Sequence, residues 1–312
     1  MSIAALLERC RFPDRHLHLG VSGGTDSVAM AVLARATGQP MTIWHVHHGV
    51  RDAADDDATF VERLAGEWGV PFELRHLDME PTPNFEAIAR AQRYAALPDD
   101  VCVAHTADDR AETVLLNLLR GAGLAGTAAR MANVLRPILS LTRRDTVAVC
   151  RAAGITPCED ETNDDVSRHR AAVRHRLLPE MTASLGRDVV PILNRHADLV
   201  ADALVVVEAA AAALDPTDVR ALRAAPRAVA SEALRAWIQA ESGDAYVVDL
   251  ATIERVLDVV DGRHRAAETL GGHRVARREG RLSFSPAERA DRPPSDGVAM
   301  LGHRAEQEVG GS

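Results

Sequence analysis

Lysine is absent from this chain of 312 residues, so every one of its 36 Lys+Arg positions is arginine. A Walker A phosphate loop ends in Gly-Lys-Ser/Thr, and its lysine reaches the β- and γ-phosphates of the nucleotide. The absence of lysine therefore argues against kinase-like or GTPase-like transfer of a terminal phosphoryl group.

Cysteine is scarce, and no C-x-x-C pair occurs among Cys10, Cys102, Cys150 and Cys158. This argues against a disulfide framework and against a structural zinc site, so we expect buried thiols that act as small apolar residues. No stretch approaches the apolar length of a membrane span, and the N-terminus lacks the charged-then-apolar plan of a signal peptide. We therefore expect a cytoplasmic protein without a membrane partner.

The composition is that of a globular protein, with 46% hydrophobic and 26% charged residues. The net charge of −9 argues against a surface that binds nucleic acid everywhere. A local basic segment exists nevertheless, with Arg168, Arg170, Arg174 and Arg176 close together. Arg170 and Arg174 are four residues apart and would share one helical face, which is either a solvated face or a site for phosphate and RNA.

Short β-rich runs alternate with helical patterns through the first half of the chain. We predict strands near Leu17 to Val21, Met41 to His45, Phe72 to His76 and Val101 to Ala104. This rhythm is typical of an α/β fold with a parallel, Rossmann-like sheet covered on both faces, whose ligands bind beyond the carboxyl ends of the strands. The segments after three of these strands, at 22–27, 45–48 and 105–109, should therefore meet at one edge of the sheet.

The second half is different in character. We predict a catalytic domain over 1–188, a linker helix over 189–215, a smaller and mostly helical domain over 216–285, and a disordered tail over 286–312. Within the smaller domain, Asp249 to Val260 reads as an amphipathic helix and Gly272 to Phe284 as a hairpin. The tail is charged and rich in proline and glycine.

The strongest motif follows the first strand and reads Ser22-Gly-Gly-Thr-Asp-Ser27. Gly23 and Gly24 carry no Cβ, so their N–H groups can approach an anion, and the following helix offers the unpaired donors and positive dipole end of its first turn. Ser22 and Ser27 add hydroxyl donors, and Asp26 can hold Mg²⁺ against phosphates. The alternative is a surface turn leading into a capped helix.

Two further segments follow strands. The first, His45-Val-His-His-Gly-Val-Arg51, lacks a convincing zinc pattern, so its histidines either bind a nucleotide base or orient the loop. The second places His105, Asp108, Asp109 and Glu112 at the start of a helix. Such crowding of acids favours a cation or proton-transfer site, and the alternative is that these acids only complement the helix dipole.

These motifs together resemble the tRNA(Ile)-lysidine synthetases, a branch of the N-type pyrophosphate-loop (PP-loop) ATPases. The resemblance spans about residues 15 to 180. The loop at 22–27 resembles the ATP loop of the whole superfamily, whereas the segments 45–51, 84–90 and 104–113 resemble its RNA-modifying branches. Arg120-Gly121, Arg136 to Leu139 and the acidic segment 159–165 leading to Arg170, Arg174 and Pro179 favour lysidine synthesis.

The resemblance implies an activity. The family uses ATP to adenylate C2 of the wobble cytidine in a CAU anticodon, and the amine of free L-lysine then displaces AMP. It implies ATP and Mg²⁺ as cofactors and tRNA(Ile) as partner, and it leaves open whether the chain works as a homodimer. By this resemblance the residues that bind ATP are Ser22, Gly23, Gly24, Thr25, Asp26 and Ser27. Asp26 is also catalytic and binds the metal, and Asp109 is catalytic and contacts either the metal or the substrate amine, with His105 and Glu112 in support. Arg170, Arg174 and Arg176 bind RNA, and Arg174 is also catalytic.

Two positions depart from the family pattern: Ala171 stands where asparagine is usual, and Arg168 where an aromatic residue is expected. Three other functions compete. A PP-loop tRNA thiolase would normally need a cysteine pair or an iron–sulfur cluster. A synthetase of the NAD, GMP or asparagine type should carry an ammonia-handling feature. A non-catalytic RNA-binding adaptor should have lost Asp26, Ser27 or Asp109, all of which are present.

Overall fold

The computed structural model describes residues 2–47, 53–77, 92, 94–130, 134–158, 169–243, 248–269 and 271–287. The chain forms two compact units, Met1–Ala210 and Ala211–Ser312, and the division falls inside the long helix α10 (Val190–Ala212). Four parts of the sequence predictions lie outside the described residues: His48 to Arg51, the segment 84–90, the acidic segment 159–165 together with Arg168, and the tail after 287.

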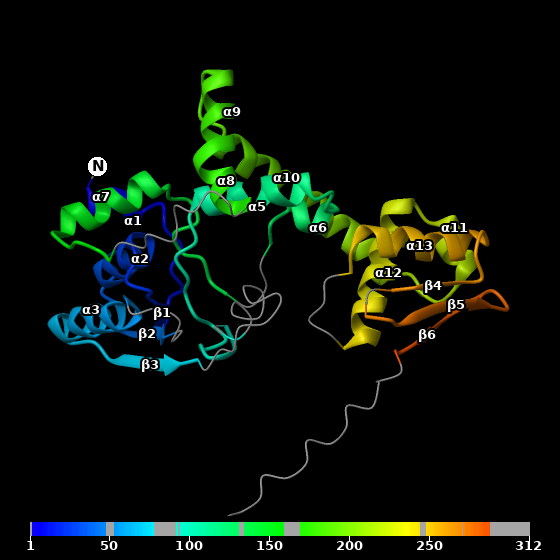
Figure 1. Cartoon of the computed structure of the whole chain (residues 1–312), viewed down its shortest axis with the longest axis horizontal. Helices are drawn as coiled ribbons and strands as arrows, with labels where there is room; N and C mark the ends of the chain where they lie inside the picture. Colours follow the sequence, from blue (N-terminus) through cyan, green and yellow to red (C-terminus); the bar gives the residue numbers. More distant parts are fainter. Residues whose placement is uncertain are drawn as a thin grey trace, which may run out of the picture. The chain divides into compact units, whose positions relative to one another are not determined.

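A parallel sheet forms the centre of unit 1 (Figure 1). Its strands are β1 (Leu17–Gly20), β2 (Met41–His47) and β3 (Phe72–His76), and β2 lies between the other two. On its other side β1 pairs in parallel with Cys102, which pairs in turn with Leu135. The strands predicted near residues 17, 41 and 72 are thus confirmed, and the one predicted near residue 101 is present as this bridge.

Helices α2 (Thr25–Ala36) and α3 (Ala53–Trp68) pack against the strands of the sheet, and α1 (Ile3–Leu7) and α7 (Arg143–Ala153) pack against α2. Helices α5 (Ala107–Leu119) and α6 (Leu124–Thr127) pack against each other. Helix α2 packs against β1, β2 and α7, and every residue from Ser27 to Ala34 is buried. Because α2 is buried all round over this stretch, its first turn is held rigidly beside the end of β1.

The arginine-rich segment is helical with one irregular turn. It comprises α8 (His169–Ala172), a π-helical turn (Val173–Leu177) and α9 (Leu178–Leu185). The N–H of Leu178 donates to the carbonyl of Val173, five residues back. Pro179 has no N–H to offer the preceding turn, which favours this wider geometry, and such turns are frequent at functional sites.

The described residues of unit 2 combine three helices with a small antiparallel sheet. The helices are α11 (Val219–Ala224), α12 (Arg227–Ser242) and α13 (Leu250–Asp261), and the strands are β4 (Ala266–Glu268), β5 (Arg274–Arg278) and β6 (Arg281–Ser285). Asp249 caps α13 through the N–H of Thr252, and β5 and β6 form the predicted hairpin. Among the described residues, no helix combines the length and the apolarity that a membrane crossing needs.

Candidate active site

The loop between β1 and α2 has the form expected of an anion cradle. Gly23 adopts a φ of +94°, and a Cβ there would lie 3.4 Å from both Asp57 Oδ1 and Cys158 Sγ. The Ser27 hydroxyl donates to the carbonyl of Gly24 (2.8 Å) and accepts from the N–H of Ser22 (3.1 Å). Gly24 is the N-cap of α2 and caps with no side chain, which leaves the first-turn donors of α2 for an anion.

His45, on the neighbouring strand β2, holds the start of this loop by a hydrogen bond to its backbone. Its Nδ1 lies 2.8 Å from the carbonyl oxygen of Val21, and only 4% of the residue is exposed. Burial lowers the pKa of His45, so the ring is neutral at pH 7 and donates from Nδ1. This geometry favours the loop-orienting interpretation of His45 over direct binding of a base.

Helix α5 begins at the second polar segment. Thr106 is its N-cap, and Asp109 completes a capping box in which Oδ2 of Asp109 accepts from the N–H and the hydroxyl of Thr106, both at 2.9 Å. One oxygen of Asp109 therefore accepts hydrogen bonds from the N-cap residue of the helix. The other oxygen, Oδ1, faces a group of arginines.

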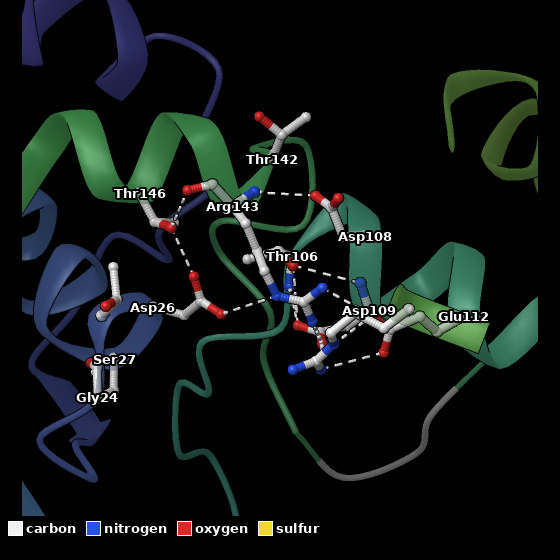
Figure 2. Close-up of polar contacts among 12 residues, drawn as sticks. Gly24, Asp26, Ser27, Thr106, Asp108, Asp109, Glu112, Thr142, Arg143 and Thr146 are labelled. Atoms are coloured by element: carbon white, nitrogen blue, oxygen red, sulfur yellow. Dashed lines mark hydrogen bonds and ion pairs between the residues drawn. The ribbon is translucent and has the colours of Figure 1, made fainter. Parts of the chain in front are cut away.

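Three arginines converge on Asp109 and Glu112, and Figure 2 shows Arg143 extending between these acids and Asp26. Arg143 donates to Asp109 Oδ1 (2.6 Å) and Glu112 Oε1 (2.7 Å). Arg170 donates to Glu112 Oε2 (2.8 Å) and Asp109 Oδ1 (3.2 Å). Arg174 donates to Glu112 Oε1 (2.9 Å) and Oε2 (3.3 Å). Arg170 and Arg174 thus share a face, as their spacing predicts, and that face meets carboxylates.

Electrostatics keep these acids ionised although they are buried. The side chain of Glu112 is 0% exposed and that of Asp109 13%. Burial alone would raise the pKa of each carboxyl group, but the hydrogen bond from Arg174 and the charge of Arg143 bring the pKa of Glu112 below its ordinary value. The charges of Arg143 and Arg170 do the same for Asp109, with a smaller contribution from His105. The cluster is therefore a set of ion pairs at neutral pH.

Asp26 lies at the edge of this cluster. Its Oδ1 accepts from the hydroxyl of Thr146 (2.6 Å), and its Oδ2 is 3.8 Å from Arg143 Nε. Burial raises the pKa of Asp26, the negative charge of Asp109 adds to the rise, and the hydrogen bond from Thr146 opposes it. Because Asp26 stands in the first turn of α2, it joins the phosphate loop to the acidic cluster.

Asp26 fits a magnesium ligand better than Asp109 does. Oδ2 of Asp26 lies 3.8 Å from Arg143 Nε, the charge of Arg174 also acts on this carboxyl group, and 28% of the side chain is exposed. Both oxygens of Asp109 already accept hydrogen bonds, so an ion could bind Asp109 only after displacing Arg143 or Arg170 from Oδ1. Among the described residues no group of three or more His, Cys, Asp or Glu side chains could hold a metal by itself. Oxygens of the nucleotide would have to complete the coordination of Mg²⁺.

The sequence predictions are met unevenly. Ser22, Gly23, Gly24, Thr25, Asp26 and Ser27 form one loop and helix start, and Asp109, Arg170 and Arg174 meet in one cluster. Arg176 is exposed and lies outside that cluster. Ala171, at the position of the usual asparagine, is buried.

Arg143 and Thr146, which contact Asp26, were missed from the sequence. The available signal was Thr142-Arg-Arg-Asp145, a capping box with two arginines in the first turn of α7. Positive charge is unfavourable at that end of a helix unless acids face it, so the two arginines there pointed to an acidic partner.

Comparison with known proteins places this geometry in a class. Residues 1–181 match the family described as a PP-loop domain. Among solved structures, the U34-tRNA thiolase NcsA from Methanococcus maripaludis shares the fold at a TM-score of 0.53 and 16% identity, over 64% of this chain and 77% of the thiolase chain. The chain therefore carries a PP-loop ATPase fold.

Curated relatives define the branch. The tRNA(Ile)-lysidine synthase of Salinispora tropica is 36% identical over 84% of this chain and 88% of that protein. The enzyme of the same name from Rhodococcus erythropolis is 34% identical over 86% of this chain and 90% of that protein. This chain belongs to the tRNA(Ile)-lysidine synthase family, as the sequence motifs predict.

Proposed function

We propose that this protein converts the wobble cytidine of the CAU anticodon of tRNA(Ile) to lysidine, with ATP and free L-lysine as co-substrates. In the first step the C2 carbonyl oxygen of cytidine attacks the α-phosphorus of ATP, and the bond to the β-phosphate breaks, releasing pyrophosphate. In the second step the ε-amine of lysine bonds to C2 and AMP leaves with the former carbonyl oxygen. The observation that carries the proposal is the contact between a phosphate loop and a cluster of paired acids and arginines, made through Asp26 and Arg143.

The loop serves the first step. The N–H groups of Gly23, Gly24 and the start of α2 would hold the triphosphate, and they stabilise the charge that develops on the leaving pyrophosphate. Asp26, together with phosphate oxygens, would hold Mg²⁺, which would supply further charge stabilisation. Ser22 and Ser27 keep the loop in shape through their mutual hydrogen bonds.

The acids serve the second step. Lysine has an ordinary pKa of about 10.4, so making its amine neutral at pH 7 costs about 4 to 5 kcal/mol. A carboxylate beside the amine binds the ammonium group and can accept its proton as the bond to C2 forms, so that a free neutral amine need not be produced first. Asp109 and Glu112 remain ionised in their buried positions and so suit this role, with His105 close to Asp109.

Three arginines bind the RNA in this proposal. Arg174 and Arg170 are 21% and 41% exposed, so each can present part of its guanidinium to a phosphate or to the adenylated base while it still contacts the acids. We assign the exposed Arg176 to the RNA backbone as well. We further propose that unit 2 contacts the body of the tRNA.

The absence of lysine from the chain suits this chemistry, since no side-chain ε-amine can intercept the adenylated cytidine. The thiolase alternative lacks support from the cysteines. Burial raises the pKa of Cys10, Cys102, Cys150 and Cys158 to about 11 in each case, which leaves very little reactive thiolate at pH 7.

One assay tests the activity. Purified protein is incubated with Mg²⁺, ATP, radiolabelled lysine and a CAU-anticodon tRNA(Ile) transcript, with the elongator tRNA(Met) transcript as the control. We expect label in tRNA(Ile) alone and AMP as the nucleotide product. Equal labelling of both transcripts, labelling of neither, or accumulation of ADP contradicts the proposal.

A further inference from the structure

The first turn of α7 contacts each acid of the site. The N–H of Arg143 donates to Asp108 Oδ2 (2.9 Å), and its guanidinium reaches Asp109, Glu112 and Asp26. Thr146, three residues later on the same face, donates to Asp26 (2.6 Å). Helix α7 is itself fixed, because the Thr142–Asp145 capping box closes its first turn and it packs along α2.

The three arginines of the cluster differ in how firmly the structure holds their backbone. Arg170 precedes the π-helical turn and Arg174 belongs to it, and their side chains are 41% and 21% exposed, against 27% for Arg143, so the difference lies in the backbone and not in exposure. Arg143 stands at the first position of a capped helix, and its own backbone N–H is bonded to the α5 residue Asp108. Arg143 is also the member of this trio with an ion pair to Asp26. Contacts with α5 and with Asp26 in α2 therefore both fix the position of Arg143.

The charges of the cluster balance only while all three arginines stay on the acids. Asp26, Asp109 and Glu112 supply three negative charges, which Arg143, Arg170 and Arg174 balance. When an RNA phosphate draws Arg170 and Arg174 toward itself, oxygens of Asp109 and Glu112 become open to another cation. A fixed guanidinium must remain on these acids at that moment, because two buried carboxylates within reach of each other repel and would otherwise take up a proton.

We propose that Arg143 is a positioning residue for the amine-transfer step: it holds Asp109 and Glu112 in the orientation that receives the lysine ammonium group after Arg170 and Arg174 engage the RNA. This inference rests on the proposed function. Arg143 acts through the two acids and not on the reacting atoms. Its contact with Asp26 is long, at 3.8 Å, against 2.6 and 2.7 Å to Asp109 and Glu112. We therefore expect its influence to fall on the amine side more than on the nucleotide side.

Measuring the two half-reactions separately distinguishes an effect on lysine transfer from an effect on adenylation. Pyrophosphate release with ATP and tRNA but no lysine reports adenylation, and labelled-lysine incorporation at varied lysine reports the second step. For Arg143→Gln we expect the KM for lysine to rise about 10- to 100-fold, the range of a lost hydrogen bond to a charged group. Pyrophosphate release should change less than about threefold, since an ion pair at 3.8 Å contributes little. Arg143→Lys should recover part of the affinity for lysine, because it restores the positive charge but not the planar guanidinium that donates to both acids.

The split between KM and kcat provides a readout that a purely structural role would not move. Because Arg143 donates to Asp109 and Glu112, its loss should raise the KM for lysine more than it lowers kcat. The matched control is Arg144→Gln, which removes an exposed arginine from the next position of α7 and should leave both half-reactions unchanged.

Three outcomes overturn the assignment. In the first, Arg143→Gln lowers adenylation and lysine transfer by the same factor, in step with a loss of folded protein seen by circular dichroism. In the second, Arg143→Gln behaves like Arg144→Gln. In the third, Arg143→Lys transfers lysine no better than Arg143→Gln while remaining folded. A wild-type protein that adenylates tRNA(Ile) but never incorporates lysine refutes the proposed function itself, and the role of Arg143 with it.

Discussion

Glu112→Gln removes the most deeply buried charge of the site and keeps the shape of the side chain. Glu112 is 0% exposed and accepts hydrogen bonds from Arg143, Arg170 and Arg174 at 2.7 to 3.3 Å. Removing one partner of a buried ion pair typically costs 3 to 5 kcal/mol. The guanidiniums are 21% to 41% exposed and can regain some hydration, so we expect a loss of about 3 kcal/mol in the free energy of unfolding of unit 1.

The same substitution predicts a pH dependence. The pKa of Glu112 is lower in the folded protein than its ordinary value of 4.5, so its charge stabilises the fold fully above that value. The stabilisation is lost as pH falls through the lower folded pKa. The difference in unfolding free energy between wild type and Glu112→Gln should therefore be constant near pH 7 and shrink below about pH 4.5.

Denaturant unfolding followed by tryptophan fluorescence measures this difference. Trp44 and Trp68 lie in unit 1, and a Trp237→Phe background removes the signal of unit 2. Glu67→Gln is the matched control, because Glu67 is 62% exposed and forms an ion pair with Arg63 at 4.0 Å; we expect a change below about 0.5 kcal/mol. The reasoning fails if Glu112→Gln costs no more than Glu67→Gln, or if the difference does not shrink in acid.

Three further predictions concern the loop and the arginines. Asp26→Asn keeps an acceptor for the Thr146 hydroxyl, so it should remain folded yet lose about 100-fold or more in turnover; full activity would exclude Asp26 as the metal ligand. Arg174→Ala should impair tRNA modification more than ATP binding, and an equal loss in nucleotide titration and in turnover would contradict its assignment to RNA. Burial lowers the pKa of His45, so the wild-type fold should lose stability as pH falls below 6.5, and His45→Asn should lose less. An equal change in unfolding free energy between pH 7.5 and pH 5.5 for the two proteins would contradict this prediction.

Local patterns were enough to predict the elements of the sheet and the two polar segments at its edge. Alternation of β-rich runs and helical runs predicted β1, β2 and β3, and the glycine pair before Asp26 predicted the turn into α2. The spacing of Arg170 and Arg174 predicted a shared face, and four residues of helix suffice to enforce it despite the π-helical turn. These features depend on neighbours within a few residues, so the sequence carries them directly.

The partners of the charged groups could not be predicted in this way. Asp109 and Glu112 suggested a cation, and the cations present are arginines from segments 31 to 62 residues further along the chain. Arg143 gave only an indirect signal, its unfavourable place at a helix start. Ion pairs of this kind depend on how α5, α7 and α8 pack together, and no local rule gives that packing.

The sequence alone determined that the chain builds a PP-loop with a phosphate-binding helix start and places acids and arginines on helices beyond the sheet, since strand period, glycine and helix caps are local properties. Only the tertiary structure decided how these charges neutralise one another. Three elements must meet before Glu112 can be buried, and the low dielectric of that junction makes each carboxylate depend on its arginines. Assembly of the site is thus coupled to folding of unit 1, through charges that none of the contributing segments could bury alone.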